Sequence, residues 1–134
     1  MKKSNTQKQV YLVDDHPLMR ESLAALLQQE LGLVVCGEAD NAERAEQEIE
    51  ERKPDLAILD LSLKESSGFE LIKSLRSATP ELKIIVLSMH DERLYAERCI
   101  RGGANKYLMK RGSSERIVAA VSDVLSWKAE GRQP

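Results

Sequence analysis

Short apolar runs alternate with longer amphipathic stretches along the chain, five times in succession. The runs cover residues 10–13, 33–36, 56–59, 84–87 and 106–108. Runs such as LAIL and IIVL are apolar at consecutive positions rather than at every second one, which is typical of strands covered on both faces. The pattern therefore predicts an α/β domain with a five-stranded parallel sheet and helices on both of its faces.

The stretches between the runs carry signals for helix starts and ends. The first helix is predicted to begin at Pro17 and to end at Gly32, and the third to open on a capping box from Ser67 to Glu70. The fourth, at residues 92–101, has only a narrow apolar side, which predicts weak anchoring. Helical spacing predicts these buried faces: Met19, Leu23, Leu26, Leu27 and Leu31 in the first helix, Ala42, Ala45 and Ile49 in the second, and Ile117, Val121, Val124 and Leu125 in the fifth.

Size and composition fit one globular domain. The chain has 134 residues, 42% of them hydrophobic and 31% charged, with a net charge of -2. It lacks the basic excess of a nucleic-acid binder, so DNA contact by this chain alone is not favoured. We expect a disordered tail at residues 1–9, one domain at residues 10–126 and the start of a linker at residues 127–134. No run of about 18 apolar residues occurs, and Cys36 and Cys99 form no metal-binding pattern, which predicts a cytoplasmic protein with reduced thiols and no membrane contact.

Polar residues that can carry chemistry follow four of the five strands. Asp14 and Asp15 follow the first strand, Asp60 the third, Ser88 the fourth and Lys110 the fifth. Each has an ordinary explanation when taken singly, as a cap or a solvated side chain. Ligands in open α/β sheets bind at the carboxyl ends of the strands, so together the five predict one shared site.

Three carboxylates crowded at such an edge need a cation. At about 4 Å and an effective dielectric near 20, each pair repels by roughly 4 kcal/mol. Hard carboxylate oxygens favour Mg²⁺. A carboxylate can also attack phosphorus and form an aspartyl phosphate when the charge on the transferring group is neutralised, here by Mg²⁺ and Lys110. Asp60 is the candidate acceptor because it ends the strand predicted to lie at the centre of the sheet.

The segments VYLVDDHPLMRESLAALL, DLAILDLSL, IIVLSMHDE and GGANKYLMK resemble the receiver domains of NarL/FixJ-type response regulators of two-component systems. The resemblance implies a flavodoxin-like (βα)5 fold with strand order 2-1-3-4-5 and phosphorylation of Asp60. It further implies that Asp14, Asp15, Asp60 and the main-chain carbonyl of Ser62 bind Mg²⁺, that Ser88 and Lys110 contact the phosphoryl group, and that Tyr107 changes position with Ser88 as a switch.

The resemblance also implies partners. A sensor histidine kinase, or a small acyl phosphate, would donate the phosphoryl group, and phosphorylation could drive homodimerisation. A C-terminal DNA-binding output domain, absent from this chain, would control transcription. The domain would not be an enzyme in the usual sense, since its phosphoryl transfer and autodephosphorylation act on itself.

Three positions depart from the wider family or vary within it. Lys64 stands where many receivers have proline, and Arg111 stands where a cis-forming proline often follows the lysine, so a trans peptide is expected there. Met89 is larger than the residue that many receivers have after Ser88. We hypothesise that Met89 and His90 screen the acyl phosphate from water.

Other classes of protein fit less well. A phosphatase of the haloacid dehalogenase type needs a second acid two residues after the nucleophile, and Ser62 occupies that position. A ligand-binding flavodoxin-like domain needs a glycine-rich or hydroxyl-rich loop after the first strand, where this chain has the acidic DDHP. A stand-alone receiver and a pseudo-receiver that binds partners without phosphorylation stay open as alternatives.

Overall fold

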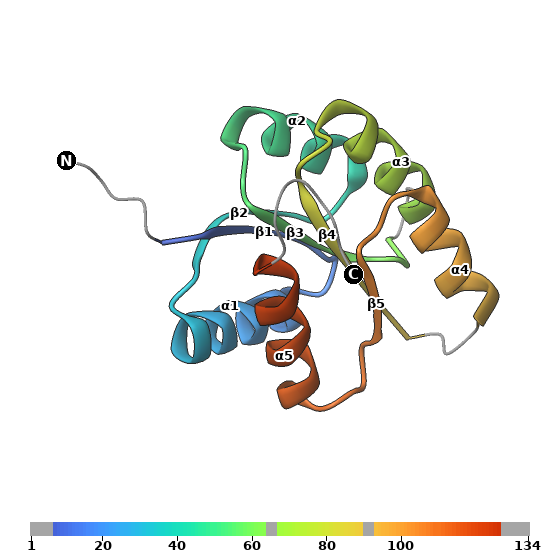
Figure 1. Ribbon diagram of the computed structural model, residues 1–134. Helices are drawn as coiled ribbons and strands as arrows, with labels where there is room; N and C mark the ends of the chain where they lie inside the picture. Colours follow the sequence, from blue (N-terminus) through green and yellow to red (C-terminus); the bar gives the residue numbers. More distant parts are fainter. Residues whose placement is uncertain (1–6, 64–66, 90–92, 127–134) are drawn as a thin grey trace.

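A central parallel sheet with helices on both faces forms the molecule (Figure 1). The computed structural model describes residues 7–63, 67–89 and 93–126. The elements, in chain order, are β1 (Gln9–Val13), α1 (Pro17–Leu31), β2 (Val34–Ala39), α2 (Ala42–Arg52), β3 (Leu56–Asp60), α3 (Gly68–Ala78), β4 (Lys83–Ser88), α4 (Arg93–Gly102), β5 (Lys106–Met109) and α5 (Ser114–Leu125). The five strands lie in the order β2-β1-β3-β4-β5 and pair in parallel, which confirms the predicted order.

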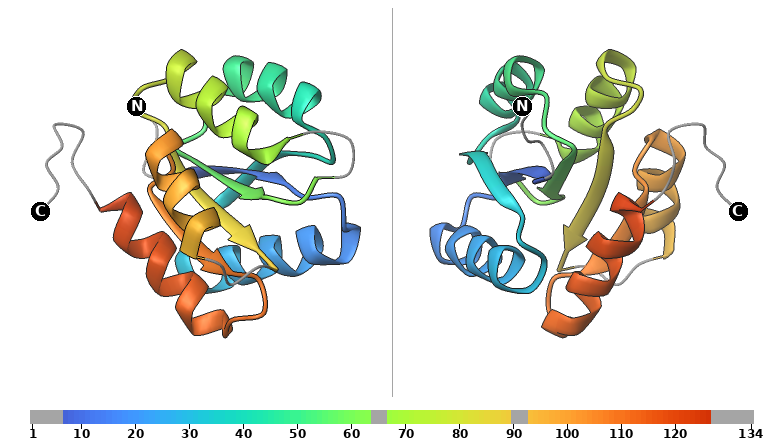
Figure 2. Two further views of the ribbon diagram at one scale, coloured as in Figure 1. Left: turned by 90° about the vertical axis from the view of Figure 1, so that its right-hand side faces the viewer. Right: turned by 60° about the vertical axis from the view of Figure 1, so that its left-hand side comes forward.

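The sheet separates two hydrophobic cores. Helices α1 and α5 cover one face, whereas α2, α3 and α4 cover the other (Figure 2). Strand residues contribute alternately to the two cores, as the pleat of a sheet requires. Ile58 and Ile85, for example, face the α1–α5 side, while Ala57 and Ile84 face the other. Burial on both faces explains why the central strands read as continuous apolar runs.

Most helix ends lie where the sequence predicted them. Pro17 is the first residue of α1, and Gly32 ends the helix in a left-handed conformation with φ of 66°. The Ser67 side chain accepts a hydrogen bond from the Glu70 backbone N–H at the start of α3. In α4 only Cys99 is buried, in agreement with the narrow apolar side of that helix.

The second strand is present as predicted, but it extends further than its apolar run. It runs from Val34 to Ala39 rather than over residues 33–36. This strand lies at the edge of the sheet and is only partly buried, so Gly37 and Glu38 within it give no apolar signal. An irregularity between Val10 and Tyr11 also places Tyr11 beside Gly37, where an added Cβ would lie 2.6 Å from the Tyr11 Cε2 atom.

Several predictions concern residues that the structure does not describe. Lys64, His90 and the proposed linker at residues 127–134 lie outside the described ranges, as does most of the predicted tail at residues 1–9. Those boundaries stay predictions. Within the described ranges, no helix has both the length and the apolar character needed to cross a lipid bilayer.

Candidate functional site at the carboxyl ends of the strands

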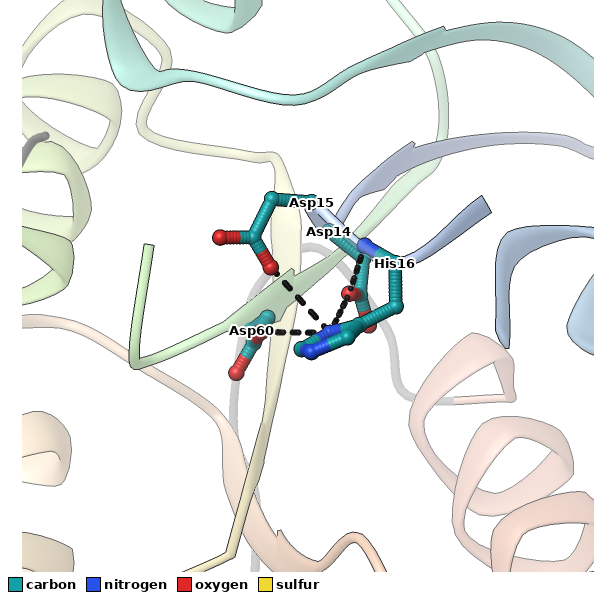
Figure 3. Close-up of side chains that lie close together, drawn as sticks. All are labelled: Asp14, Asp15, His16 and Asp60. Carbon is teal, nitrogen blue, oxygen red and sulfur yellow. Dashed lines mark hydrogen bonds and ion pairs between the residues drawn. The ribbon is translucent and has the colours of Figure 1, made fainter. Parts of the chain in front are cut away.

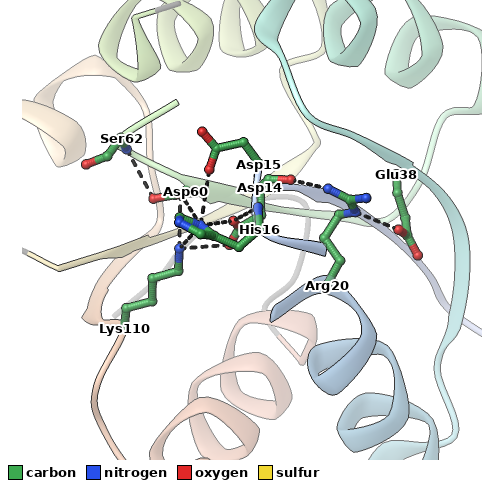
Figure 4. A network of polar contacts seen from close by, with 8 residues as sticks. All are labelled: Asp14, Asp15, His16, Arg20, Glu38, Asp60, Ser62 and Lys110. Carbon is green, nitrogen blue, oxygen red and sulfur yellow. Dashed lines mark hydrogen bonds and ion pairs between the residues drawn. The ribbon is translucent and has the colours of Figure 1, made fainter. Parts of the chain in front are cut away.

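The sheet gathers the predicted site residues at one edge, as Figure 4 shows for most of them. Asp14 directly follows β1, Asp60 is the last residue of β3, Ser88 is the last residue of β4, and Lys110 directly follows β5. Asp14, Asp60 and Ser88 are also the buried polar residues among those the structure describes. Buried charges require partners, so the contacts of these groups define the site.

Lys110 bridges two of the carboxylates. Its Nζ lies 2.9 Å from Asp14 Oδ2 and 3.0 Å from Asp60 Oδ2, and its side chain is 7% exposed. Burial lowers the pKa of Lys110, but the hydrogen bonds and charges of Asp14 and Asp60 outweigh that effect and raise it overall. The ammonium group is therefore a fixed positive charge beside the Asp60 carboxylate.

The other oxygen of Asp60 faces the loop after β3. The Ser62 backbone N–H donates a hydrogen bond to Asp60 Oδ1 at 3.1 Å, and the Leu61 N–H bonds to the Leu87 carbonyl at 3.1 Å. These two bonds hold the chain beyond Asp60 against the carboxylate and against β4. The predicted metal ligand, the Ser62 carbonyl, belongs to this same loop, but its role is a prediction that the geometry does not test.

Sequence reasoning did not select His16, which lies in the middle of the acidic group (Figure 3). The His16 Nδ1 atom lies 2.9 Å from Asp14 Oδ1, 3.1 Å from Asp15 Oδ1 and 3.9 Å from Asp60 Oδ2. The Lys110 Nζ lies 3.3 Å from the same ring nitrogen. The sequence position of His16, directly after the acidic pair, could have indicated this contact, because a short loop can fold the ring back onto its neighbours.

Arg20 is the second residue that sequence reasoning missed. Its Nη1 donates a 2.6 Å hydrogen bond to the main-chain carbonyl of Asp14, and its Nε pairs with Glu38 Oε1 at 2.8 Å (Figure 4). Arg20 therefore ties the loop after β1 to the edge strand β2. Nothing in the sequence pattern distinguishes this arginine from a solvated one.

Ser88 and Tyr107 lie on the same face of the sheet. In the β4–β5 register Tyr107 is opposite Val86, and Ser88 is two residues beyond Val86 on the same strand. Tyr107 is half-buried and lines a cavity of about 490 Å³ with Arg93, Ala96 and Ile117, among others. There is space beside the tyrosine, although the switch itself remains a prediction. No cis peptide occurs in the described residues, so the Arg111 peptide is trans as predicted.

The site has the composition of a metal centre. Ligand atoms of Asp14, Asp15, His16 and Asp60 all lie within 4.8 Å of one another. Three of these residues are the carboxylates predicted from the sequence, and the fourth adds an imidazole. This acidic cluster, hereafter the strand-end cluster, could bind a metal ion.

Five parallel strands with an acidic site at their carboxyl ends define a flavodoxin-like α/β domain. Comparison with known families gives the class more narrowly. A model of the response regulator receiver domain matches residues 10–122. The chain therefore belongs to the response regulator receiver domain family.

Individual relatives agree with this assignment. A LuxR-family response regulator from Aurantimonas has a TM-score of 0.86 and is 29% identical, covering 90% of this chain and 86% of its own. The signal receiver domain of NarL from Mycobacterium tuberculosis has a TM-score of 0.81 and is 32% identical, covering 96% of this chain and 100% of its own. The transcriptional regulatory protein DegU of Brevibacillus brevis is 30% identical over 116 residues, which are 87% of this chain and 49% of DegU.

The chain spans about half the length of the curated relatives it matches. The other half of each relative has no counterpart among the matched residues. The family assignment therefore applies to the receiver domain itself.

Proposed function

We propose that the domain is a phosphorylation switch in which Asp60 accepts a phosphoryl group in the presence of Mg²⁺. The observation that carries the proposal is the position of the Asp60 carboxylate, which is buried at the end of the central strand between Lys110 and the Ser62 N–H. A carboxylate held this way by a cation can attack an incoming phosphorus atom. An Asp60 oxygen forms the new P–O bond, and the donor leaves with the electron pair of its own bond to phosphorus.

The donor set fits Mg²⁺. The carboxylates of Asp14, Asp15 and Asp60 supply the hard oxygen ligands that this ion prefers, and the Ser62 main-chain carbonyl would supply another. Bound Mg²⁺ would neutralise charge on the phosphoryl oxygens and orient them. The three carboxylates share the site with one lysine, so a divalent cation would relieve much of their mutual repulsion.

Other residues would serve the phosphorylated state. Lys110 would exchange one carboxylate contact for a phosphoryl oxygen, and the Ser88 hydroxyl would donate to another. Movement of Ser88 toward the phosphoryl group would leave room on the face it shares with Tyr107, and the cavity beside Tyr107 lies between α4, β5 and α5. The face built by those three elements would then change shape.

The partners follow from the family. A sensor histidine kinase, or a small acyl phosphate, would supply the phosphoryl group in the cytoplasm. Several relatives are named as transcriptional regulators, so we infer that the switch controls a DNA-binding output domain, with homodimerisation on phosphorylation. The chemistry is directed at the domain itself, including autodephosphorylation, for which Met89 and His90 would screen the acyl phosphate from water.

Intact mass spectrometry after incubation with acetyl phosphate tests the proposal. Wild-type protein should gain one phosphoryl group in Mg²⁺ and none in EDTA, and Asp60→Asn should gain none. Asp55→Asn is a matched control, because Asp55 lies before β3 at the opposite end of that strand. Folded wild-type protein that gains no phosphoryl group would favour the pseudo-receiver alternative.

A further inference from the structure

The His16 ring is turned toward the strand-end cluster rather than toward its own helix. His16 is the residue that precedes α1, yet its side chain makes no capping hydrogen bond to that helix. The ring nitrogen Nδ1 instead lies within 4 Å of three carboxylates, with the ring itself 63% exposed. The His16 ring therefore lies on the solvent side of the buried carboxylates, with one of its nitrogens toward them.

The distances around Nδ1 match those between ligands of one metal ion. With metal–ligand bonds of about 2.1 Å, adjacent ligands of an octahedral ion lie about 3.0 Å apart and opposite ligands about 4.2 Å apart. Nδ1 lies 2.9 Å and 3.1 Å from oxygens of Asp14 and Asp15, and 3.9 Å from an oxygen of Asp60. Four ligand atoms can thus surround one ion once the Lys110 ammonium group, which lies 3.3 Å from Nδ1, has moved aside.

A nitrogen ligand changes which ion the site prefers. Mg²⁺ favours oxygen ligands, whereas imidazole suits Zn²⁺, Ni²⁺ and Cu²⁺. We propose that His16 makes the strand-end cluster a site for a borderline transition ion of the Zn²⁺ class, held by Asp14, Asp15, Asp60 and the His16 imidazole. This inference rests on the proposed function only because both use the carboxylates of Asp14, Asp15 and Asp60.

Occupation by such an ion opposes phosphorylation. An ion held by the His16 imidazole as well as by the three carboxylates would have fewer open positions for phosphoryl oxygens than Mg²⁺, which keeps several waters. Lys110 would also have to withdraw from its contacts with Asp14 and Asp60. The same carboxylates cannot hold Mg²⁺ at the same time. Zinc-class ions would therefore act as competitive inhibitors of the switch.

Direct metal binding to the full chain tests the inference without measuring phosphorylation. Zn²⁺ affinity is measured by competition with a chromophoric chelator and Mg²⁺ affinity by calorimetry, for wild type, His16→Gln and His90→Gln. His90 is the only other histidine of the chain, so it is the matched control. We expect His16→Gln to lower the Zn²⁺ affinity by about tenfold or more, and to leave the Mg²⁺ affinity unchanged. His90→Gln should change neither.

Nitrogen ligation also has a spectroscopic signature. In ¹⁵N NMR, Zn²⁺ should shift the His16 ring nitrogens, whereas Mg²⁺ should not. Zn²⁺ affinity unaltered by His16→Gln, or lowered equally by His90→Gln, would overturn the inference and leave the proposed function intact if Mg²⁺ still binds. Wild-type protein that binds neither ion would overturn both.

Discussion

Replacing Asp15 with asparagine should stabilise the metal-free domain. Ligand oxygens of Asp14, Asp15 and Asp60 lie within 4.8 Å of one another, while the contacts of Lys110 go to Asp14 and Asp60. At 4.8 Å and an effective dielectric of about 20, two unit charges repel by about 3.5 kcal/mol. Asp15→Asn removes two of the three repelling pairs, leaves the pair of Asp14 and Asp60, and keeps the size of the side chain.

Two effects reduce the gain. The variant loses the attraction between Asp15 Oδ1 and the His16 ring at 3.1 Å, and water at the rim of the site screens the charges. We therefore expect the free energy of unfolding in EDTA to rise by about 1 to 3 kcal/mol. Asp40→Asn, a change at an exposed aspartate, should stay within about 0.5 kcal/mol of wild type.

Urea unfolding in EDTA and in Mg²⁺ measures the stability of the metal-free and the metal-bound domain. A ligand that binds only the folded state stabilises it by about 2.7 kcal/mol at a hundred times its Kd. Wild type should show such a gain in Mg²⁺, and Asp15→Asn should lose most of it. The reasoning is refuted if Asp15→Asn is less stable than wild type in EDTA, or if Mg²⁺ stabilises both proteins equally.

Three further predictions concern parts of the fold outside the site. Gly37→Ala should destabilise the domain by about 1 to 3 kcal/mol in urea unfolding, because the new Cβ would meet the fully buried Tyr11 ring; unchanged stability would contradict this. Iodoacetamide should modify half-buried Cys36 before Cys99, which is fully buried and whose pKa burial raises to about 11; equal rates by peptide mass would refute it. The hydrogen bond from Tyr11 lowers the pKa of Glu48, so Glu48 stabilises the fold above its unfolded pKa and loses this effect as pH falls through the folded value. Glu48→Gln should therefore show a shallower loss of stability in acid, whereas equal acid slopes would exclude the interpretation.

The sequence predicted the architecture and the acidic edge because both depend on strand ends. In a parallel sheet every carboxyl end lies at the same edge, so locating the ends of β1, β3, β4 and β5 was enough to bring Asp14, Asp60, Ser88 and Lys110 together. The end of the edge strand β2 was predicted too early because Gly37 and Glu38 interrupt its apolar run.

The directions of two side chains at the start of α1 could not be predicted in the same way. His16 precedes the helix and Arg20 lies in its first turn, and the apolar spacing of the helix does not say which polar group either side chain contacts. Arg20 donates a hydrogen bond to the main-chain carbonyl of Asp14. Every residue type has such a carbonyl, so the sequence does not indicate this contact. The half-burial of Tyr107 depends on how α4 packs, and the narrow apolar side of that helix says little about its position.

Chemical trapping of the phosphorylated residue tests the central claim most directly. Borohydride reduces an acyl phosphate at aspartate to homoserine, which tandem mass spectrometry locates in a peptide. After incubation with acetyl phosphate and Mg²⁺, the account predicts homoserine at position 60 alone, and none when EDTA replaces Mg²⁺. Homoserine at Asp14 or Asp15, or a phosphoryl group retained elsewhere when Asp60 is unmodified, would contradict it.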